Sequence, residues 1–173
     1  MNYSDYIRTI PDFPRKGILF RDITTLVGDG DAFRSAVNLF VERYRGKGIS
    51  KIVGIEARGF IFGSAIAYAL GIGFIPIRKK GKLPAETIEE SYELEYGTDY
   101  MEIHKDAISP GERVVLFDDL IATGGTLRAA MNLIERLGGR IHEISCLIEL
   151  TPLAGREKIP DIPFFSVIKY NVD

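Results

Sequence analysis

The sequence predicts an α/β protein with one domain, built on a mainly parallel sheet flanked by helices. Apolar residues recur alternately at helical spacing and in short strand-like runs, which is typical of such domains. The 173 residues, of which 46% are hydrophobic and 27% charged, suit a single domain with a full core. With 22 basic and 24 acidic residues, the chain has no overall positive field that would hold DNA or RNA. Any phosphate site must therefore be local.

The first forty residues contain Pro11, Pro14 and Gly17 within a short space. They are expected to begin as a helix and to continue as an irregular covering segment. A hood over a site is one use for such a segment, and a surface elaboration fits the pattern nearly as well. Further along, apolar spacing predicts a helix over residues 33–44, and residues 51–55 predict a buried strand.

Residues 59–77 carry no charged side chain and approach the length that spans a bilayer. A glycine turn near Gly71 instead divides them into a helix over residues 59–70 and a short buried strand over residues 73–77, so no membrane association is expected. The N-terminus shows no basic region followed by an apolar one, which predicts no secretory signal. Cys146 is the only cysteine, which favours a reducing, cytoplasmic setting.

Residues 79–107 differ from their surroundings because they are rich in charge. Alternating runs at residues 91–96 and 100–104, about a turn at residues 97–99, predict a two-stranded excursion from the main sheet. A lid over a site and a plain surface elaboration both fit this excursion. The main pattern then resumes, with a strand at residues 113–117, a helix at 125–137 and a strand at 141–150.

The strongest local signal for chemistry follows the strand at residues 113–117. That strand ends at two adjacent carboxylates, Asp118 and Asp119, where ligands bind in open α/β sheets. A short loop of small and hydroxylated residues then opens a helix, so backbone N–H groups, hydroxyls and the helix dipole can all meet an anion. This predicted phosphate-binding loop comprises Ala122, Thr123, Gly124, Gly125 and Thr126.

The two carboxylates would repel a phosphate that touched them, so we expect them to accept hydrogen bonds from sugar hydroxyls. They could also stand near a Mg²⁺ ion bound to a diphosphate. A sugar phosphate suits both parts of this pattern, because its hydroxyls can bind the carboxylates and its phosphate can bind the loop. Alternatively, Asp118 caps the turn and the glycines only tighten it, although capping needs a single carboxylate. The chain has no Walker loop, dinucleotide fingerprint or zinc-ligand spacing.

Residues 117–126 resemble the phosphoribosyl-diphosphate-binding motif of type I phosphoribosyltransferases. Other segments resemble, in order and spacing, the adenine-specific members of that family. These segments are residues 12–14, 17–23, 56–60, 78–84, 94–97 and 149–151, and they are spread over nearly the whole chain. The resemblance implies the type I phosphoribosyltransferase fold over residues 1–173, with a hood at residues 1–30 and a mobile lid at residues 79–107.

For the ribose side of the site, the resemblance implies that Asp118 and Asp119 hold the ribose hydroxyls and that the loop from Ala122 to Thr126 wraps the 5′-phosphate. Ala57 and Arg58 would meet the diphosphate, with Arg58 neutralising the leaving group. Judged by spacing alone, Arg58 could equally be a solvated residue at a helix start.

For the lid, the resemblance implies that Arg78, Lys79 and Lys82 face the diphosphate when a mobile loop closes. Taken alone, a charge run is usually a solvated face. The same resemblance makes Glu95 a catalytic carboxylate that exchanges a proton with the purine ring, with Tyr96 beside it. Without the resemblance, Glu95 would be one exposed strand carboxylate among several.

For the base, the resemblance makes Phe20 and Arg21 candidates for stacking and backbone hydrogen bonding around adenine. The implied reaction is the transfer of phosphoribose from 5-phosphoribosyl 1-diphosphate to adenine, giving AMP and diphosphate for purine salvage. Mg²⁺ is the expected cofactor, held mainly by diphosphate and ribose rather than by protein ligands. A homodimer is expected, with neither nucleic acid nor membrane as a partner.

Two rival functions remain open from the sequence. The first is a phosphoribosyltransferase for another purine, such as xanthine or guanine, with the same ribose site and a different hood. The second is a non-catalytic regulator that senses phosphoribosyl diphosphate and acts on nucleic acid. Such a regulator would be expected to carry an added DNA-binding module or a basic face, and this slightly acidic chain offers neither.

Overall fold

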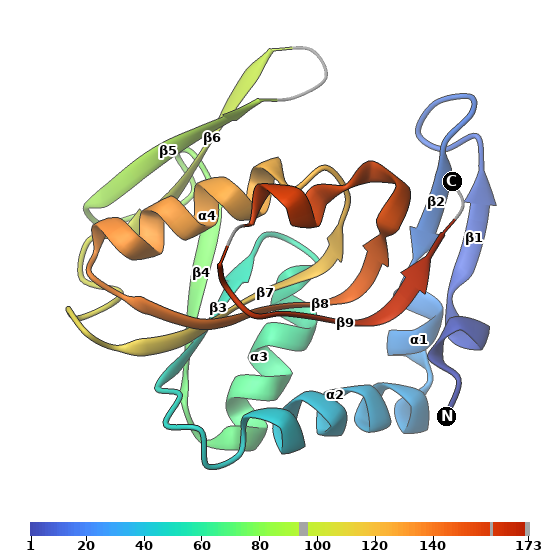
Figure 1. The fold of residues 1–173 in the computed structure, drawn as a ribbon, viewed down its shortest axis with the longest axis horizontal. Helices are drawn as coiled ribbons and strands as arrows, with labels where there is room; N and C mark the ends of the chain where they lie inside the picture. The colour runs from blue at the N-terminus through green and yellow to red at the C-terminus, as the bar shows by residue number, and fades with distance from the viewer. Residues whose placement is uncertain (94–96, 160, 172–173) are drawn as a thin grey trace.

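A seven-stranded sheet forms the centre of the protein in the computed structural model, which describes residues 1–93, 97–159 and 161–171. The strand order is β5-β6-β4-β3-β7-β8-β9 (Figure 1). The parallel strands are β3 (Lys51–Ile55), β4 (Gly73–Lys79), β7 (Arg113–Ile121), β8 (Arg140–Leu150) and β9 (Phe164–Tyr170). The antiparallel hairpin of β5 (Thr87–Glu93) and β6 (Thr98–His104) joins one edge. The predicted α/β class with a mainly parallel sheet is confirmed.

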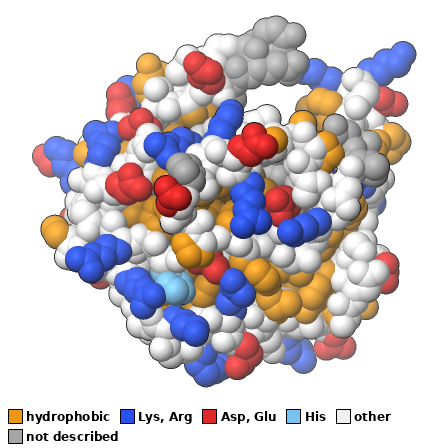
Figure 2. Space-filling model, in the orientation of Figure 1, with side chains coloured by type: hydrophobic (Ala, Val, Ile, Leu, Met, Phe, Trp, Pro, Cys, Tyr) orange, Lys and Arg blue, Asp and Glu red, His pale blue; other side chains and the backbone are white. Residues whose placement is uncertain are grey.

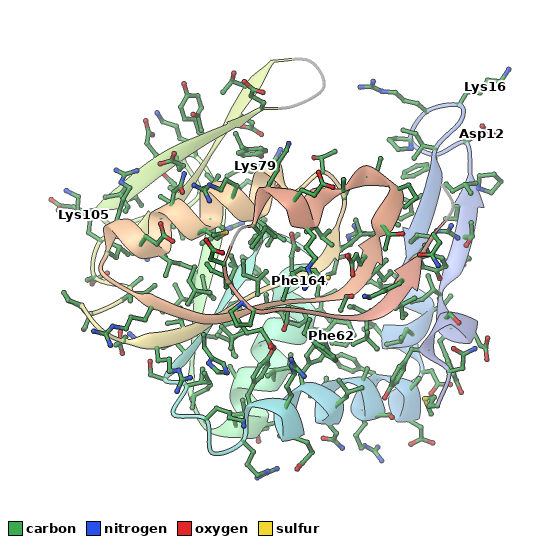
Figure 3. All side chains as sticks on the ribbon, in the orientation of Figure 1. Asp12, Lys16, Phe62, Lys79, Lys105 and Phe164 are labelled. Atoms are coloured by element: carbon green, nitrogen blue, oxygen red, sulfur yellow. The ribbon has the colours of Figure 1, made fainter. Side chains whose placement is uncertain are left out.

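Helices cover both faces of the sheet. Figure 1 shows α2 (Gly30–Tyr44) and α3 (Gly59–Leu70) on one face and α4 (Gly125–Arg136) on the other. Alternate residues of β7 enter two separate cores, because successive side chains of a strand point to opposite faces. Phe117 packs with Phe62 of α3 in the first core (Figure 3), and Leu116 lies in the second. Covering both faces explains the continuous apolar runs of the strands.

Several predicted elements are confirmed in position. Strand β3 and helix α3 match their predicted bounds, and α4 begins at Gly125 as expected. Strand β4 extends two residues beyond the predicted strand, because Arg78 and Lys79 pair with β6. Strand β9 lies outside the predicted elements. In the described part of the chain, no helix is long and apolar enough to cross a membrane.

The end of β7 differs from the prediction. A strand that stopped at Phe117 would place Asp118 and Asp119 in a loop, but β7 continues to Ile121. The continuation follows from the length of β8, whose residues still offer ladder partners to Asp118, Leu120 and Ile121. The two carboxylates are therefore held by the sheet itself rather than by a loop.

The N-terminal segment also differs from the prediction. Apart from a short 3-10 turn at Tyr3–Tyr6, it forms an antiparallel pair of strands, β1 (Arg8–Pro11) and β2 (Leu19–Asp22), before the short helix α1 (Thr24–Gly28). An ion pair of 2.5 Å between Arg8 and Asp22 supports the pairing. Pairing gives the backbone groups of both strands partners that an irregular segment would lack. Asp12 and Lys16 lie at the tip of this hairpin (Figure 3).

The charged excursion is a hairpin, as predicted, but its strands are placed differently. The ladder pairs Tyr92 with Asp99 and Glu93 with Thr98, so Thr98 and Asp99 belong to a strand rather than to the predicted turn. The hairpin also joins the main sheet through β4. The two hairpins lie on opposite sides of the molecule, one at β4 and the other beside β9, and both project toward the top of the view in Figure 1. Figure 2 shows basic and acidic side chains interspersed on the visible face, in keeping with the formal charge of −2.

Candidate active site

The carboxyl ends of β3 and β7 bring two distant segments of the chain together. The strands pair in parallel, with Gly54 opposite Phe117. The turn that follows β3 therefore lies beside Asp118, and a β-carbon at Gly59 would come within 3.0 Å of the Asp118 carboxylate. Only glycine allows this close approach without displacing a neighbour. The site is thus assembled where ligands usually bind in α/β sheets.

Arg58 connects three of the predicted functional segments. Its Nε lies 2.9 Å from Oδ2 of Asp119, a residue that is only 4% exposed. This contact is an ion pair rather than an aligned hydrogen bond. Arg58 also donates from Nη1 to the backbone carbonyl of Arg21 at 3.4 Å, and its guanidinium lies 5.0 Å from the ring centre of Phe20. The structure therefore places Arg58 between the carboxylate of Asp119 and the predicted hood.

The electrostatics of the two carboxylates depend on burial and on Arg58. Burial raises the pKa of Asp118 well above its ordinary value, and the neighbouring charge of Asp119 raises it further. Burial also raises the pKa of Asp119, while the positive charge of Arg58 opposes that rise. A ligand that donates hydrogen bonds to these two carboxylates, or that brings a positive charge near them, would stabilise their ionised form.

The predicted phosphate-binding loop is packed against a turn from the far end of the chain. Gly124 precedes the first residue of α4 and has a φ angle of +79°, a conformation that suits glycine. A β-carbon at Gly124 would overlap the carbonyl oxygen of Gly155, and one at Gly155 would overlap that of Ala122. A small cavity of about 90 Å³ lies at the loop, lined among others by Asp118, Thr123 and Thr126. The N-terminus of α4 would face an anion bound here, and its first turn carries no acidic residue.

The basic residues predicted to meet diphosphate gather around Glu56. Its Oε1 accepts hydrogen bonds from Lys82 Nζ at 2.5 Å and Arg78 Nη2 at 3.1 Å. Its Oε2 accepts from the backbone N–H of Lys79 at 2.9 Å. The side chain of Lys79 pairs instead with Asp99 at 3.0 Å, so this lysine turns away from the other two. Glu56 thus brings Arg78 and Lys82 to the end of β3, and Glu56 itself lies two residues before Arg58 in the chain.

We expect Glu56→Gln to lower the free energy of unfolding at pH 7 by about 1 kcal/mol, because Arg78 and Lys82, both partly exposed, lose a charged acceptor. Burial opposes the charge of Glu56, but hydrogen bonds from Lys82, Arg78 and Lys79 outweigh it and lower its pKa from 4.5 to about 2. A lowered pKa means that this stabilisation is complete above pH 4.5 and is lost as the pH falls through about 2. Urea unfolding at several pH values should show the wild type and the variant converging over that window.

The matched control for this prediction is Glu86→Gln. Its side chain is 84% exposed and forms an ion pair with Lys105 at 3.3 Å, so its loss should change stability little. Equal effects of the two substitutions, or a constant difference down to low pH, would contradict the assigned role of Glu56.

The hood contributes aromatic surface and a backbone acceptor. Phe20 makes an edge contact with Phe13, whose ring lies 5.1 Å away at 78° and is half exposed. The side chain of Arg21 is engaged elsewhere: it donates to Thr9 at 2.7 Å and lies 3.8 Å from the ring centre of Tyr170. Arg21 thus fixes the hood to β9, and its carbonyl rather than its guanidinium faces Arg58.

The catalytic carboxylate predicted at Glu95, and Tyr96 beside it, lie outside the described residues. The end of β5 nevertheless reaches the phosphate-binding loop, because a β-carbon at Gly125 would lie 3.8 Å from the carbonyl oxygen of Glu93. Helix α4 holds the hairpin there, with Arg136 and Asn132 both donating to the carboxylate of Glu90.

Gly155 and Tyr170 contact this site but are absent from the sequence-based candidates, and Glu56 appears there only as part of residues 56–60, without a role of its own. Glu56 directly follows the buried strand β3, and this strand-end signal could have identified it. No local pattern marks Gly155 or Tyr170, because each acts through a contact with a residue far away in the chain.

Comparisons with known proteins agree with this geometry. A model of the phosphoribosyl transferase domain matches residues 31–172. An adenine phosphoribosyltransferase of Leptospira biflexa is 56% identical, over 95% of this chain and 94% of that protein. The crystal structure of adenine phosphoribosyltransferase from Thermoanaerobacter pseudethanolicus has a TM-score of 0.94 at 51% identity, and covers 97% of this chain and 98% of its own. That of the Saccharomyces cerevisiae enzyme, complexed with an imino-altritol bisphosphate and adenine, has a TM-score of 0.91 at 41% identity, with coverages of 95% and 96%. The chain therefore belongs to the phosphoribosyltransferase family and, within it, to the adenine phosphoribosyltransferases.

Proposed function

We propose that the protein transfers the phosphoribosyl group of 5-phosphoribosyl 1-diphosphate to adenine, giving AMP and diphosphate. The observation that carries this proposal is the position of Arg58, which contacts Asp119 on one side and the Phe20–Arg21 segment on the other. A sugar bound at Asp119 and a base bound under the hood would meet beside this arginine. The relative from Saccharomyces cerevisiae, whose structure holds adenine and a sugar-like bisphosphate, supports the same pairing of ligands.

The roles of the residues follow from where charge develops during the reaction. As the bond from the anomeric carbon to diphosphate stretches, positive charge grows on the ribose and negative charge on the leaving group. Arg58, Arg78 and Lys82 are the cations that would neutralise the leaving group. The buried Nε of Arg78 has no acceptor among the described residues, and a diphosphate oxygen would supply one.

The ribose phosphate would be held by the loop and the carboxylates. The N–H groups at Gly124, Gly125 and Thr126, together with the Thr123 hydroxyl, offer donors to the 5′-phosphate. Asp118 and Asp119 would accept hydrogen bonds from the ribose hydroxyls, which favour their ionised forms. Positioning and charge stabilisation then account for most of the catalysis, and the protein forms no covalent intermediate.

The residues present fit a Mg²⁺ ion that is held mainly by the substrate. Within residues 1–93, 97–159 and 161–171, no group of three or more acidic, His or Cys side chains could hold a metal by itself. Mg²⁺ commonly keeps several waters and binds through substrate phosphates with one or two carboxylates, and Asp118 and Asp119 stand at the right edge of the sheet. When bound, the ion would offset the negative charge of the diphosphate.

The remaining parts of the proposal concern the lid and the setting of the enzyme. Glu95 is proposed to exchange a proton with the purine ring, on a lid that excludes water from the reactive sugar. A homodimer is proposed, and Tyr68 of α3, which is 90% exposed, is the kind of aromatic residue that a partner covers. A cytoplasmic setting is proposed because the single cysteine, Cys146, is buried as a free thiol.

The first experiment is an assay of diphosphate release from phosphoribosyl diphosphate and Mg²⁺, with adenine, guanine, hypoxanthine and xanthine in parallel. We expect turnover with adenine alone. Turnover with an oxopurine would support the proposed ribose site but contradict the assignment of the hood to adenine. Binding of phosphoribosyl diphosphate without turnover of any base would favour the regulatory alternative, which salt-dependent DNA binding would then test.

A further inference from the structure

Glu102 is a buried carboxylate within the predicted lid, and it is none of the predicted site residues. It lies in the middle of β6, opposite Arg78 of β4 on one side and Glu89 of β5 on the other, and is only 5% exposed. Its Oε1 accepts hydrogen bonds from the backbone N–H groups of Gly81 at 2.9 Å and Leu83 at 3.3 Å. Its Oε2 accepts from the hydroxyl of Thr87 at 3.1 Å. A buried carboxylate is tolerated only with such partners, so these contacts are specific.

The two backbone donors flank Lys82, one of the proposed diphosphate-binding residues. Glu102 thus holds the peptide on both sides of this lysine, while the lysine side chain reaches Glu56 at 2.5 Å. The carbonyl of Lys82 also accepts from Arg78 Nη1 at 3.4 Å. Glu102 therefore holds the backbone N–H groups of the turn, Glu56 holds the side chain of Lys82, and Arg78 holds its carbonyl.

Part of this turn lies open to solvent. Gly81 and Lys82 are exposed, and Gly81 has a φ angle of +86°. Without an acceptor, the N–H groups of Gly81 and Leu83 would turn toward water, and the turn would sample other conformations. Ordering it again on substrate binding would cost conformational entropy, which weakens binding.

We infer that Glu102 is a positioning residue, which fixes the turn at residues 81–83 so that Lys82 and Arg78 are aligned for the diphosphate. This inference rests on the proposed function, because it presupposes that Lys82 meets the leaving group. Glu102 itself touches no substrate. Its effect passes through the backbone of the turn.

The test compares three substitutions at or near this carboxylate. Glu102→Ala should raise the KM for phosphoribosyl diphosphate about tenfold, as expected for the loss of one charge-assisted hydrogen bond. The KM for adenine should change less than about twofold, since the hood is untouched. Glu102→Gln should restore most of the affinity, because its amide oxygen can accept from the same two N–H groups. Glu86→Ala, which removes an exposed carboxylate from the same hairpin, is the matched control.

Thermal unfolding establishes that each variant is folded at the assay temperature. If Glu102→Ala is not, Glu102→Met replaces it, because a side chain of similar volume fills the space without accepting hydrogen bonds. A rise in KM that is equal for both substrates, or that Gln fails to reverse, would overturn the inference.

The decisive comparison repeats the experiment in a Lys82→Ala background. If Glu102 acts through Lys82, Glu102→Ala should raise the KM for phosphoribosyl diphosphate much less there than in the wild type. The same rise in both backgrounds would show that Glu102 acts elsewhere, and would overturn the inference while leaving the role of Lys82 intact. A Lys82→Ala variant with an unchanged KM would instead contradict the proposed function of Lys82, and the inference would fall with it.

Discussion

Replacing Gly124 by alanine is expected to raise the KM for phosphoribosyl diphosphate about 100-fold, the largest effect that the structure predicts for a single methyl group. The added β-carbon would overlap the carbonyl oxygen of Gly155, and the φ angle of +79° disfavours any side chain. The loop must then move away from the turn beneath it. Losing one or two charge-assisted hydrogen bonds to phosphate accounts for a change of this size. Initial-rate kinetics with varied phosphoribosyl diphosphate measure it.

Gly155→Ala should produce a similar rise, although Gly155 belongs to no recognised motif. Its β-carbon would overlap the carbonyl oxygen of Ala122 from the opposite side of the same contact. Gly30→Ala is the control, because a β-carbon there has no neighbour within 4 Å and the residue begins helix α2. Normal affinity in both the Gly124 and Gly155 variants would mean that the loop does not require this packing.

Replacing Arg58 by glutamine is expected to lower kcat/KM about 100- to 1,000-fold, because the proposed function gives the residue two electrostatic tasks. It would stabilise the charge of the leaving diphosphate, and it pairs with the buried carboxylate of Asp119 at 2.9 Å. Removing one member of a buried pair leaves an uncompensated charge, which is strongly unfavourable.

The pH dependence of the Arg58→Gln variant separates these two tasks. Burial raises the pKa of Asp119 and Arg58 opposes that rise, so loss of the arginine should raise the pKa further. If ribose binding requires ionised Asp119, activity is lost as the pH falls through that pKa, and the acidic limb of the kcat/KM profile moves to higher pH. Arg58→Lys, which keeps the charge, should show a smaller shift. An acidic limb unchanged in both variants would refute the proposed control of Asp119 by Arg58.

The sequence by itself determined the elements whose signals are local. The apolar run at Lys51–Ile55 and the helical pattern at Gly59–Leu70 are complete within their own residues, so periodicity predicts them with their bounds. The loop from Ala122 to Thr126 is likewise visible in sequence, because its glycines and hydroxyls are contiguous and open a helix. The family resemblance added roles to these residues that their types alone left open.

Tertiary structure decided everything that depends on which distant segments become neighbours. Strand β7 continues through Asp118 and Asp119 because β8, which follows a helix, is long enough to pair with it. The first strands form because β1 and β2 pair across the turn between them, which spacing did not reveal.

The same reason explains the contacts that complete the site. Arg58 meets Asp119, and Gly155 supports the phosphate-binding loop, across separations of tens of residues. Glu102 holds the turn at residues 81–83 only because β6 lies beside β4. Periodicity and propensity act over a few residues, whereas strand order and register follow from the burial of whole faces. The sequence therefore predicts what the loop binds, and only the fold shows which residues hold it in place.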